Sequence, residues 1–453
     1  MFAKGFKIHF IGLGGIGMSA LAGHLMSKGC VVSGSDLCDS QILQNFKKQG
    51  VEVFLDQKKT NIRDDIDLVI ITLAIEENNP ELISAKLKKI KILTYPQALG
   101  EFTKEFYLIS ICGSHGKSTS TAMLSKVLID ANLDPNVLIG TKLQEFANTN
   151  YRIGESDYFV MESCEYKEAF LYYSPSAILV TNIDPDHLDY YGNTENYYKA
   201  YEKFVGKLKG GGILVINGDS NKISAFAGMT ERTFGENEKN DYVLKGGEIY
   251  LHGELIGKLN LKVPGRHNRI NACGVFAIAD ALKIDRKVIL NALNNFEGTW
   301  RRLEYKGKIS SGAIVYDDYG HHPTEIKASL EAMRELYPLN NLICVFQPHQ
   351  FSRTRFFWDE FARSFSYADQ VIIPNIYKVR DEKSDFPEIS AENLVKEISK
   401  YHKNVVYGNG FENTAKILKE KTSGNDVIVI MGAGDVERIG KIIFLKGNHA
   451  LYL

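Results

Sequence analysis

Short apolar runs alternate with segments of helical spacing along the first part of the chain. Residues 7–11, 31–35 and 68–73 are apolar and short enough to be strands, and residues 18–28 follow a glycine-rich loop with the apolar spacing of a helix. Strands and helices that alternate in this way are typical of a parallel sheet covered by helices. The pattern predicts a first α/β domain over residues 1–105, with Pro96 in the connection that closes it.

A second block of the same kind covers residues 106–299. It opens with an apolar strand predicted at residues 107–112, and two further predicted strands, at residues 158–161 and 177–183, run straight into polar residues. Residues 210–263 are rich in glycine and in strand-forming residues, which predicts an insertion that contains a hairpin. A helix after Asn268 then leads to a boundary near Gly298.

The last part of the chain, residues 300–453, repeats the alternation of strands and helices. Amphipathic helical segments separate five apolar runs, which lie at residues 313–316, 342–346, 371–373, 405–407 and 427–431. We therefore predict three α/β domains in series, and the first and third are expected to have Rossmann-like sheets.

The composition agrees with three domains and excludes several classes of protein. A length of 453 residues allows roughly 150 residues for each domain. The 54 Lys and Arg residues are balanced by 55 Asp and Glu residues, which gives a formal net charge of −1. Because the chain has no overall positive field, we expect no nucleic acid and no membrane as a partner, and local geometry must hold any polyanion.

The cysteines and the N-terminus indicate a cytoplasmic protein. The six cysteines form no Cys-x-x-Cys pair, which argues against a zinc site or a disulfide framework and suits a reducing cytosol. No apolar run approaches the roughly 18 residues that span a bilayer. Glycines also interrupt the N-terminal apolar stretch where a signal peptide would have its hydrophobic region.

A glycine-rich loop follows the first predicted strand. It reads Gly12, Leu13, Gly14, Gly15, Ile16, Gly17, and Asp36 lies at the end of the next strand. Glycines let the backbone approach a diphosphate, and the N-terminus of the following helix offers it free N–H groups. Asp36 is placed to accept a bond from a ribose hydroxyl. The loop predicts a diphosphate ligand, and it leaves open whether that ligand is NAD or a nucleotide sugar.

A second phosphate loop follows the strand predicted at residues 107–112. It comprises Gly113, Ser114, His115, Gly116, Lys117, Ser118 and Thr119. Ile111 stands where the usual pattern has its first glycine, but the Gly116-Lys117-Ser118 end is intact. In such a loop the backbone N–H groups wrap a phosphate, the lysine reaches the β- and γ-phosphates, and the serine hydroxyl binds Mg²⁺.

Two phosphate loops on one chain favour an ATP-driven reaction on a nucleotide-linked substrate. A dehydrogenase has no use for the second loop, so an NAD-dependent oxidoreductase remains an alternative that rests on the first loop alone. A nucleotide-gated binding module without chemistry is another alternative, because it would keep both loops.

Polar residues at two strand ends are candidate metal ligands. Glu162 follows the strand predicted at residues 158–161, and His187 follows the strand predicted at residues 177–183. In open α/β sheets, ligands gather beyond the carboxyl ends of the strands. With Ser118, these side chains are reasonable ligands for a divalent metal beside phosphates. Such strand ends are also often no more than turns and helix caps.

Taken together, these motifs resemble those of the Mur ligase family along nearly the whole chain. The segments that carry the resemblance are residues 12–19, 113–119, 162–166, 181–187, 267–272, 301–302, 317–325, 347–349, 352–354 and 432–435. The resemblance implies an N-terminal domain that holds a UDP-sugar, a central P-loop ATPase-like domain and a C-terminal domain that binds the amino acid and closes over both.

The resemblance also implies roles for individual residues. The UDP-sugar would be bound by Gly12, Gly14, Gly15, Ile16, Gly17, Met18, Ser19 and Asp36. ATP would be bound by residues 113–119 together with Asn268, Arg302 and Asp318, with Asn268 near adenine. Magnesium would be held by Ser118, Glu162 and His187. The amino acid would lie among Tyr319, His321, His349 and Arg353. The residues expected to act in catalysis are Lys117, Glu162, His187, His321 and Arg353.

The branch of the family that the motifs resemble joins L-alanine to UDP-N-acetylmuramate. A carboxylate is a poor acyl donor, so ATP would first convert it to an acyl phosphate, which the amine then attacks. His321 or His349 is expected to deprotonate the amine, with His187 as a competitor for that role. A ligase that attaches a recycled tripeptide to the same UDP-sugar is an alternative. The expected assembly is a monomer or a homodimer.

Three positions depart from the family pattern. Gln57 stands where a histidine is common, which affects the expected uridine contacts. Gln350 replaces the arginine that commonly follows Pro-His, so Arg353 is left for the amino-acid carboxylate. Tyr201 occupies the position of the carbamoylated lysine of sibling ligases, as expected of the alanine-adding branch.

Overall fold

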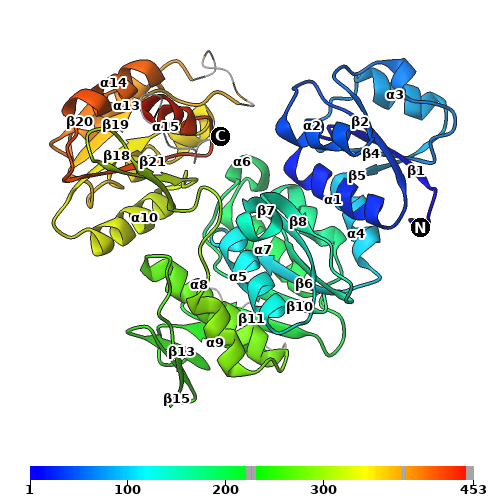
Figure 1. Cartoon of the computed structure of the whole chain (residues 1–453), viewed down its shortest axis with the longest axis horizontal. Coiled ribbons are helices and arrows are strands. Elements are labelled where there is room, and N and C mark those ends of the chain that lie inside the picture. Colours follow the sequence, from blue (N-terminus) through cyan, green and yellow to red (C-terminus); the bar gives the residue numbers. More distant parts are fainter. Residues whose placement is uncertain (221–225, 227–230, 380, 382–383, 385, 445–453) are drawn as a thin grey trace. The chain divides into compact units, whose positions relative to one another are not determined.

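The chain folds into two compact units. The computed structural model describes residues 1–220, 226, 231–379, 381, 384 and 386–444. The first unit comprises Met1–Asn260 and Ile270–Phe296, and the second comprises Leu261–Arg269 and Glu297–Leu453. Figure 1 shows three sheets, two of them in the first unit and one in the second.

The N-terminal sheet is parallel, with the strand order β3-β2-β1-β4-β5. Its strands are β1 (Lys7–Ile11), β2 (Val31–Ser35), β3 (Glu52–Phe54), β4 (Leu68–Ile71) and β5 (Lys91–Thr94). The helices beside it are α1 (Ile16–Ser27), α2 (Gln41–Lys48), α3 (Pro80–Leu87) and α4 (Tyr95–Thr103), with the short helix η1 (Lys59–Asn61). This order confirms the Rossmann-like sheet and places the carboxyl end of β1 beside the change of direction, where ligands bind in such folds.

The central sheet has the strand order β15-β14-β13-β12-β11-β10-β6-β9-β7-β8. Its parallel core consists of β6 (Tyr107–Cys112), β9 (Tyr158–Glu162), β7 (Asn136–Leu143), β10 (Ala177–Val180), β11 (Ile213–Asn217), β12 (Glu231–Gly235) and β13 (Tyr242–Lys245). Antiparallel strands finish both edges, namely β8 (Thr149–Arg152) and the pair β14 (Glu248–Leu251) and β15 (Glu254–Lys258).

Helices connect and cover these strands. They are α5 (Lys117–Asp130), α6 (Leu188–Tyr191), α7 (Thr194–Val205), α8 (Arg266–Ala281) and α9 (Arg286–Asn294), with the short helices η2 (Gln144–Phe146) and η3 (Tyr166–Tyr172). A largely buried pair, the strand β6 and the helix α5, carries the second phosphate loop at its junction. The loop therefore sits at the middle of the central sheet.

Two expectations for this unit need correction. Pro96 lies in the first turn of α4, not in a connection, because a proline at that position loses no helical hydrogen bond. Residues 210–263 are not a separate insertion, since β11, β12 and β13 continue the parallel sheet and only β13, β14 and β15 form antiparallel hairpins. Their apolar side chains are buried on the main sheet, which a glycine-rich composition does not reveal.

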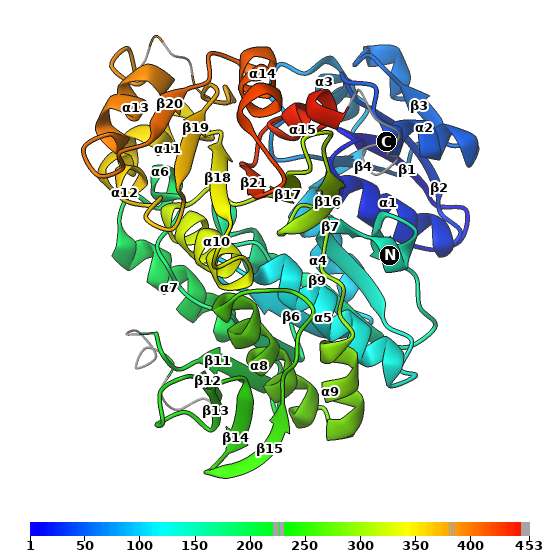
Figure 2. The same ribbon diagram turned by 60° about the vertical axis from the view of Figure 1, so that its left-hand side comes forward.

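One apolar cluster of the first unit spans both of its sheets, and a smaller one lies in the N-terminal sheet and its helices. Buried residues of α1 and β1 belong to the same cluster as residues of β6, β9 and α7. Helix α1 contacts both β7 and β8, and Figure 2 shows it beside β7. His24 of α1 is 1% exposed, its Nε2 lies 3.0 Å from the Val137 carbonyl oxygen of β7, and aromatic rings surround its imidazole.

The second unit is built on a sheet with the order β16-β17-β21-β18-β19-β20. Its strands are β16 (Glu304–Lys308), β17 (Ile314–Asp318), β18 (Asn341–Phe346), β19 (Gln370–Ile373), β20 (Val405–Tyr407) and β21 (Asp426–Met431), all parallel except the edge strand β16. Its helices are α10 (Pro323–Leu336), α11 (Phe351–Phe356), α12 (Trp358–Ala362), α13 (Ala391–Ile398), α14 (Phe411–Lys421) and α15 (Glu437–Phe444). The central strand β21 is buried along its whole length, with an apolar cluster on each face of the sheet.

Within the described part of the chain, every helix is too short or too polar to pass through a bilayer.

The buried His24 makes a pH-dependent contribution to stability. Burial lowers the pKa of His24 to about 4, whereas a histidine in an unfolded chain has a pKa near 6.5. Between these values the unfolded chain binds a proton that the folded chain does not. The free energy of unfolding therefore falls as the pH is lowered through this window, by up to about 3 kcal/mol.

We expect His24→Gln, which keeps a donor for Val137, to show a smaller loss of stability between pH 6.5 and pH 4.5 than the wild type. Urea unfolding at several pH values measures the difference. The control is His252→Gln, because the side chain of His252 is 73% exposed. Equal slopes for the wild type and the His24 variant would contradict the assignment.

Candidate active site

The first glycine loop turns the chain from β1 into α1. The N–H groups of Gly12 and Leu13 donate to the Ser35 carbonyl oxygen at 2.8 and 2.9 Å, which ties the loop to the end of β2. Gly12 has a φ of 92°, and a Cβ at this residue would lie 2.8 Å from the Thr72 methyl group. The turn therefore requires glycine here for both its conformation and its packing.

Asp36 braces the glycine loop. Its carboxylate accepts from the Gly14 N–H at 2.9 Å and from the Leu37 N–H at 2.8 Å. A carboxylate offers about four lone-pair sites, so Asp36 keeps acceptor capacity for a ligand hydroxyl. The contact with a ribose remains a prediction, and the structure adds a second role, which is to shape the loop.

The remaining residues predicted at this loop differ in exposure. Ile16 is 38% exposed, whereas Met18 and Ser19 are buried. The Ser19 hydroxyl donates to the Ile16 carbonyl oxygen at 2.9 Å. A Cβ at Gly17 would lie 2.6 Å from the Tyr95 ring, so this helical glycine allows α1 and α4 to approach each other.

The second phosphate loop is shaped by residues at the end of β10. Thr181 Oγ1 and Asn182 Nδ2 donate to the His115 carbonyl oxygen at 2.6 and 2.9 Å, and Asn182 Oδ1 accepts from the His115 N–H at 2.9 Å. Gly113 has a φ of 135°, and a Cβ there would lie only 2.0 Å from Thr181 Oγ1. Gly116 caps α5 in the left-handed conformation, beside Asn271. Residues that follow β10, the neighbouring strand, therefore hold the loop in the conformation from which α5 begins.

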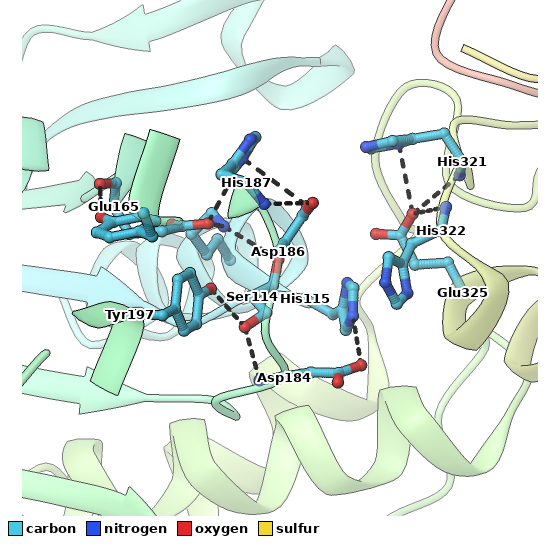
Figure 3. A network of polar contacts seen from close by, with 12 residues as sticks. Ser114, His115, Glu165, Asp184, Asp186, His187, Tyr197, His321, His322 and Glu325 are labelled. Atoms are coloured by element: carbon cyan, nitrogen blue, oxygen red, sulfur yellow. Dashed lines mark hydrogen bonds and ion pairs between the residues drawn. The ribbon is translucent and has the colours of Figure 1, made fainter. Parts of the chain in front are cut away.

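A chain of hydroxyl groups supports the same loop. Ser114 Oγ lies 2.8 Å from the Tyr197 hydroxyl and accepts from the Asp184 N–H at 2.8 Å, as Figure 3 shows. The Tyr197 hydroxyl is in turn 3.3 Å from that of Tyr201. Both tyrosines are fully buried. Tyr201 thus lies in this supporting chain.

Lys117 is held by its own loop and by a buried carboxylate. Its ammonium group donates to the carbonyl oxygens of Gly113 and Ser114 at 2.5 and 3.1 Å, and to the two carboxylate oxygens of Glu165 at 3.3 and 3.1 Å. The Glu165 side chain is 1% exposed. Although burial opposes the charge, the Glu165 carboxylate holds the pKa of Lys117 above its usual range. Lys117 is therefore a permanent cation in the loop.

Ser118 and Glu162 meet at the start of α5. The Ser118 hydroxyl donates to the Glu162 carboxylate at 2.8 Å, and the Gly140 N–H donates to the same oxygen at 2.9 Å. Hydroxyl and carboxylate oxygens are the ligands that Mg²⁺ prefers, so this pair fits a magnesium ion.

His187 lies beside a different carboxylate. Its Nε2 is 3.9 Å from Glu165 and 3.8 Å from Asp186 (Figure 3). The centroid of its ring is 4.8 Å from that of the Tyr166 ring. His187 adopts the left-handed conformation, with a φ of 54°. Its predicted role as a ligand of the same metal as Glu162 remains a prediction.

A buried arginine organises the strand ends of the second unit. Arg301 Nε donates to Asp317 at 3.1 Å, and its terminal nitrogens donate to the carbonyl oxygens of Gly432 and Gly434 at 2.6 and 3.1 Å. The side chains of Arg301 and Asp317 are only 3% and 2% exposed. This ion pair fixes the glycine turn after β21 against the end of β17.

Three residues predicted to bind the nucleotide, Asp318, Arg302 and Asn268, also belong to this unit. Asp318 is buried, and its carboxylate accepts from the Leu303 N–H at 3.2 Å and from the Ser329 hydroxyl at 2.6 Å. The Arg302 guanidinium lies 5.0 Å from the Tyr319 ring centroid. Asn268 Nδ2 donates to the Pro264 carbonyl oxygen at 2.7 Å at the start of α8. The observed contacts of Asp318 and Asn268 are thus structural, and their nucleotide contacts remain predictions.

The residues predicted around the amino acid partly gather in one place. The His321 ring lies 6.0 Å from the His349 ring and 5.6 Å from the Tyr319 ring. The His321 N–H donates to the Glu325 carboxylate at 2.9 Å, and Figure 3 shows this carboxylate beside His321. Arg353 lies in α11, four residues after His349 in the sequence. The pairing of the two imidazoles agrees with a shared role.

Sequence reasoning missed several residues of these sites. Glu165 lies within the motif of residues 162–166, three residues after Glu162, but no role was predicted for it. Gly140, in β7, donates to Glu162, and Asn182, just after β10, accepts from His115 of the phosphate loop. Tyr377 stacks on His349 with ring centroids 5.4 Å apart. Spatial neighbours of this kind leave no local pattern in the sequence.

Comparison with known proteins adds three family matches. The family described as "Mur ligase family, catalytic domain" matches residues 7–107, "Mur ligase middle domain" matches residues 111–279, and "Mur ligase, glutamate ligase domain" matches residues 301–434. Together these matches cover most of the chain.

Individual relatives are similar over nearly their whole length. The UDP-N-acetylmuramate–L-alanine ligases of Clostridium acetobutylicum and Clostridium kluyveri are 39% and 40% identical to this chain, over 97% of it and 98% of each relative. The crystal structure of a UDP-N-acetylmuramate–alanine ligase from Thermotoga maritima superposes with a TM-score of 0.81 at 29% identity, and covers 96% of this chain and 97% of that one. A murein peptide ligase from Psychrobacter arcticus shares the fold, with a TM-score of 0.72 at 21% identity over 98% of this chain and all of that one.

The Arg301–Asp317 pair predicts a specific loss of stability. Removing one partner of a buried ion pair typically costs about 3–5 kcal/mol, because the other charge stays buried and unpaired. We expect Arg301→Met to destabilise the second unit by about this much. Trp300 and Trp358, the two tryptophans of the chain, both lie in this unit, so their fluorescence during urea unfolding reports it selectively.

The double variant Arg301→Met/Asp317→Leu should recover part of the lost stability. Arg302→Met is the matched control, since the Arg302 side chain is 29% exposed and should contribute little to stability. Equal unfolding midpoints for the Arg301 and Arg302 variants would contradict the assignment.

Proposed function

The chain belongs to the Mur ligase family, and from this we propose that it joins L-alanine to UDP-N-acetylmuramate at the expense of ATP. The observation that carries the proposal is the identity of 39–40% with alanine ligases over 97% of the chain. The two phosphate loops agree with it, because the reaction needs one loop for a nucleotide sugar and another for ATP.

We propose a division of labour among the three predicted domains. Residues 1–105 would bind the UDP-sugar through the loop after β1, and residues 106–299 would bind ATP through the loop at the start of α5. Residues 300–453 would bind L-alanine and close the site. The residues proposed for each ligand are those predicted from the resemblance, and Glu165 is the partner of Lys117 beside the ATP site.

The first chemical step activates the carboxylate of the sugar. One carboxylate oxygen attacks the γ-phosphorus of ATP, the bond to the β-phosphate oxygen breaks, and an acyl phosphate and ADP result. An anion approaches an anion in this step, so the Lys117 ammonium, held in the loop by two carbonyl oxygens, would neutralise charge on the phosphates. Magnesium bound by Ser118 and Glu162 would supply further neutralisation.

The second step forms the amide bond. The amine of L-alanine attacks the acyl carbon, and the tetrahedral intermediate expels phosphate. The amine must first lose a proton, and we propose that His321 or His349 accepts it. The centroids of their rings lie 6.0 Å apart in the second unit. The pH–rate profiles of His321→Ala and His349→Ala would show which of the two accepts the proton.

The alternative functions have less support. The murein peptide ligase structure is 21% identical to this chain, against 39–40% for the alanine ligases, so a tripeptide ligase is disfavoured. An NAD-dependent oxidoreductase leaves the loop around Lys117 without a purpose. A binding module without chemistry is disfavoured because the relatives that are 39–40% identical to this chain are ligases.

We further propose that the enzyme acts in the cytoplasm. All six cysteines are free, and four of them are buried, which suits a reducing compartment. A monomer or a homodimer remains the expected assembly.

The proposed activity predicts phosphate release that depends on L-alanine. We expect the protein to release phosphate from ATP only when UDP-N-acetylmuramate, Mg²⁺ and L-alanine are all present, with glycine or L-serine as weaker substrates. Lys117→Ala should reduce the rate to background. A colorimetric phosphate assay with each component omitted in turn measures this, and release that ignores the amino acid would refute the proposal.

The Lys117–Glu165 pair predicts the sign of a change in ATP affinity. An ammonium group has three N–H donors, and here two carbonyl oxygens and Glu165 accept from it, so a phosphate must take the place of Glu165. We expect Glu165→Gln to lower the Kd for ATP by about three- to tenfold, since it weakens the competitor by roughly 1 kcal/mol.

Binding of a fluorescent ATP analogue measures the two affinities. Glu168→Gln is the matched control, because Glu168 pairs with Lys203 on the surface. An unchanged or weaker affinity in the Glu165 variant would show that the carboxylate supports ATP binding instead of competing with it.

A further inference from the structure

The hairpin of β7 and β8 touches both proposed ligand sites of the first unit. Its residues, 136–152, contain none of the motifs that carry the family resemblance, and neither strand was predicted from the sequence. One side of the hairpin contacts α1, the helix that follows the first glycine loop. The other side pairs with β9, which ends in Glu162.

Three contacts fasten α1 to the hairpin. Asn150 Nδ2 donates to the Ile16 carbonyl oxygen, at the first residue of α1, with a distance of 2.5 Å. Two turns later, a Cβ at Gly23 would lie 2.3 Å from the Tyr151 ring, and His24 Nε2 lies 3.0 Å from the Val137 carbonyl oxygen. Residues seven or eight positions apart share one face of a helix, so the whole of that face rests on the hairpin.

The hairpin also fixes the carboxylate proposed for the metal. The parallel pairing of β7 with β9 is regular from Asn136 to Leu138. Beyond it, the Gly140 N–H turns to the side chain of Glu162 and donates to Oε2 at 2.9 Å. A Cβ at Gly140 would lie 2.7 Å from that oxygen, so the approach requires glycine.

We propose that this hairpin sets the position of the UDP-sugar relative to the phosphoryl donor, with Asn150 as its positioning residue. The inference rests on the proposed function. Asn150 is 7% exposed and anchors the end of α1 that opens beside the sugar loop, whereas Gly140 anchors the carboxylate beside Ser118. Asn150 touches neither reacting group and acts through the backbone of Ile16.

The direct covalent link between the two sheets lies elsewhere. Helix α4 ends at Thr103 and β6 begins at Tyr107, so three residues join the N-terminal sheet to the central one. That link restrains the far end of α4, whereas Asn150 holds the loop end of α1 directly. In-line attack tolerates little misplacement of the attacking carboxylate, so this local anchor affects the rate.

The test uses the full-length enzyme with two substitutions of Asn150 and one control substitution on the same hairpin. Asn150→Ala removes the donor to Ile16, and Asn150→Asp keeps the shape of the side chain but lacks the N–H group. Gln144→Ala is the matched control, because Gln144 is exposed in the short helix that joins the strands. Initial rates of L-alanine-dependent phosphate release give kcat and KM for each substrate, and a fluorescent ATP analogue gives the Kd for ATP.

We expect both Asn150 variants to raise the KM for UDP-N-acetylmuramate by about three- to tenfold, the change typical of one lost hydrogen bond, and to lower kcat. The Kd for ATP and the melting temperature should stay near the wild-type values, and Gln144→Ala should match the wild type throughout. Unchanged kinetics in both Asn150 variants would overturn the inference. An equal weakening of ATP and UDP-sugar binding, with a lower melting temperature, would overturn it too, because it would reveal a general structural role.

These outcomes are separable from failure of the proposed function. If wild-type enzyme and Gln144→Ala both lack L-alanine-dependent phosphate release, the function is wrong and the kinetic comparison does not arise. Direct binding of UDP-N-acetylmuramate by calorimetry then decides the positioning role by itself. Equal affinities of the wild type and Asn150→Ala in that measurement would overturn it.

Discussion

The ion pair between Lys117 and Glu165 is the interaction around which the central site is organised. A lysine ammonium can be buried only if its charge is balanced and its donors are used, and Glu165 with two loop carbonyls does both. The same pair fixes the start of α5, where the Ser118 hydroxyl meets the Glu162 carboxylate. The charge at this site and the position of the Lys117 ammonium group therefore depend on this buried contact.

Much of the fold can be predicted from the sequence, because buried parallel strands are short continuous apolar runs. The bounds of β1, β2, β6 and β20 agree with the predicted ones. Strands β7 and β8 escaped prediction because the hairpin mixes apolar and polar residues, and its pairing depends on α1 and β9. The prediction that Pro96 lies in a connection was wrong because proline usually interrupts a helix, whereas the first helical turn accepts it.

The candidate site, like the fold, could be predicted only in part from the sequence. Motifs located both phosphate loops, since their glycines and Lys117 are close together in the sequence. The partners that fix those motifs are remote: Glu165 lies 48 residues from Lys117, and Asn150 lies 134 residues from Ile16. Asp36 and Asp318 show a further limit, because a carboxylate identified by its motif proved to hold backbone or hydroxyl groups of its own unit. Residue type and spacing do not distinguish a ligand contact from such a brace.

The two glycines within α1 have a consequence for how the chain folds as it leaves the ribosome. Glycine weakens an isolated helix by about 1 kcal/mol relative to alanine, so Gly17 and Gly23 make α1 a poor helix by itself. Tyr95 covers the first of these positions and Tyr151 the second. The N-terminal sheet is complete once β5, which ends at Thr94, has been synthesised, but one face of α1 stays uncovered until the chain has been synthesised as far as Tyr151. Nascent chains stalled before and after Tyr151 should therefore differ in how well α1 is protected from proteases.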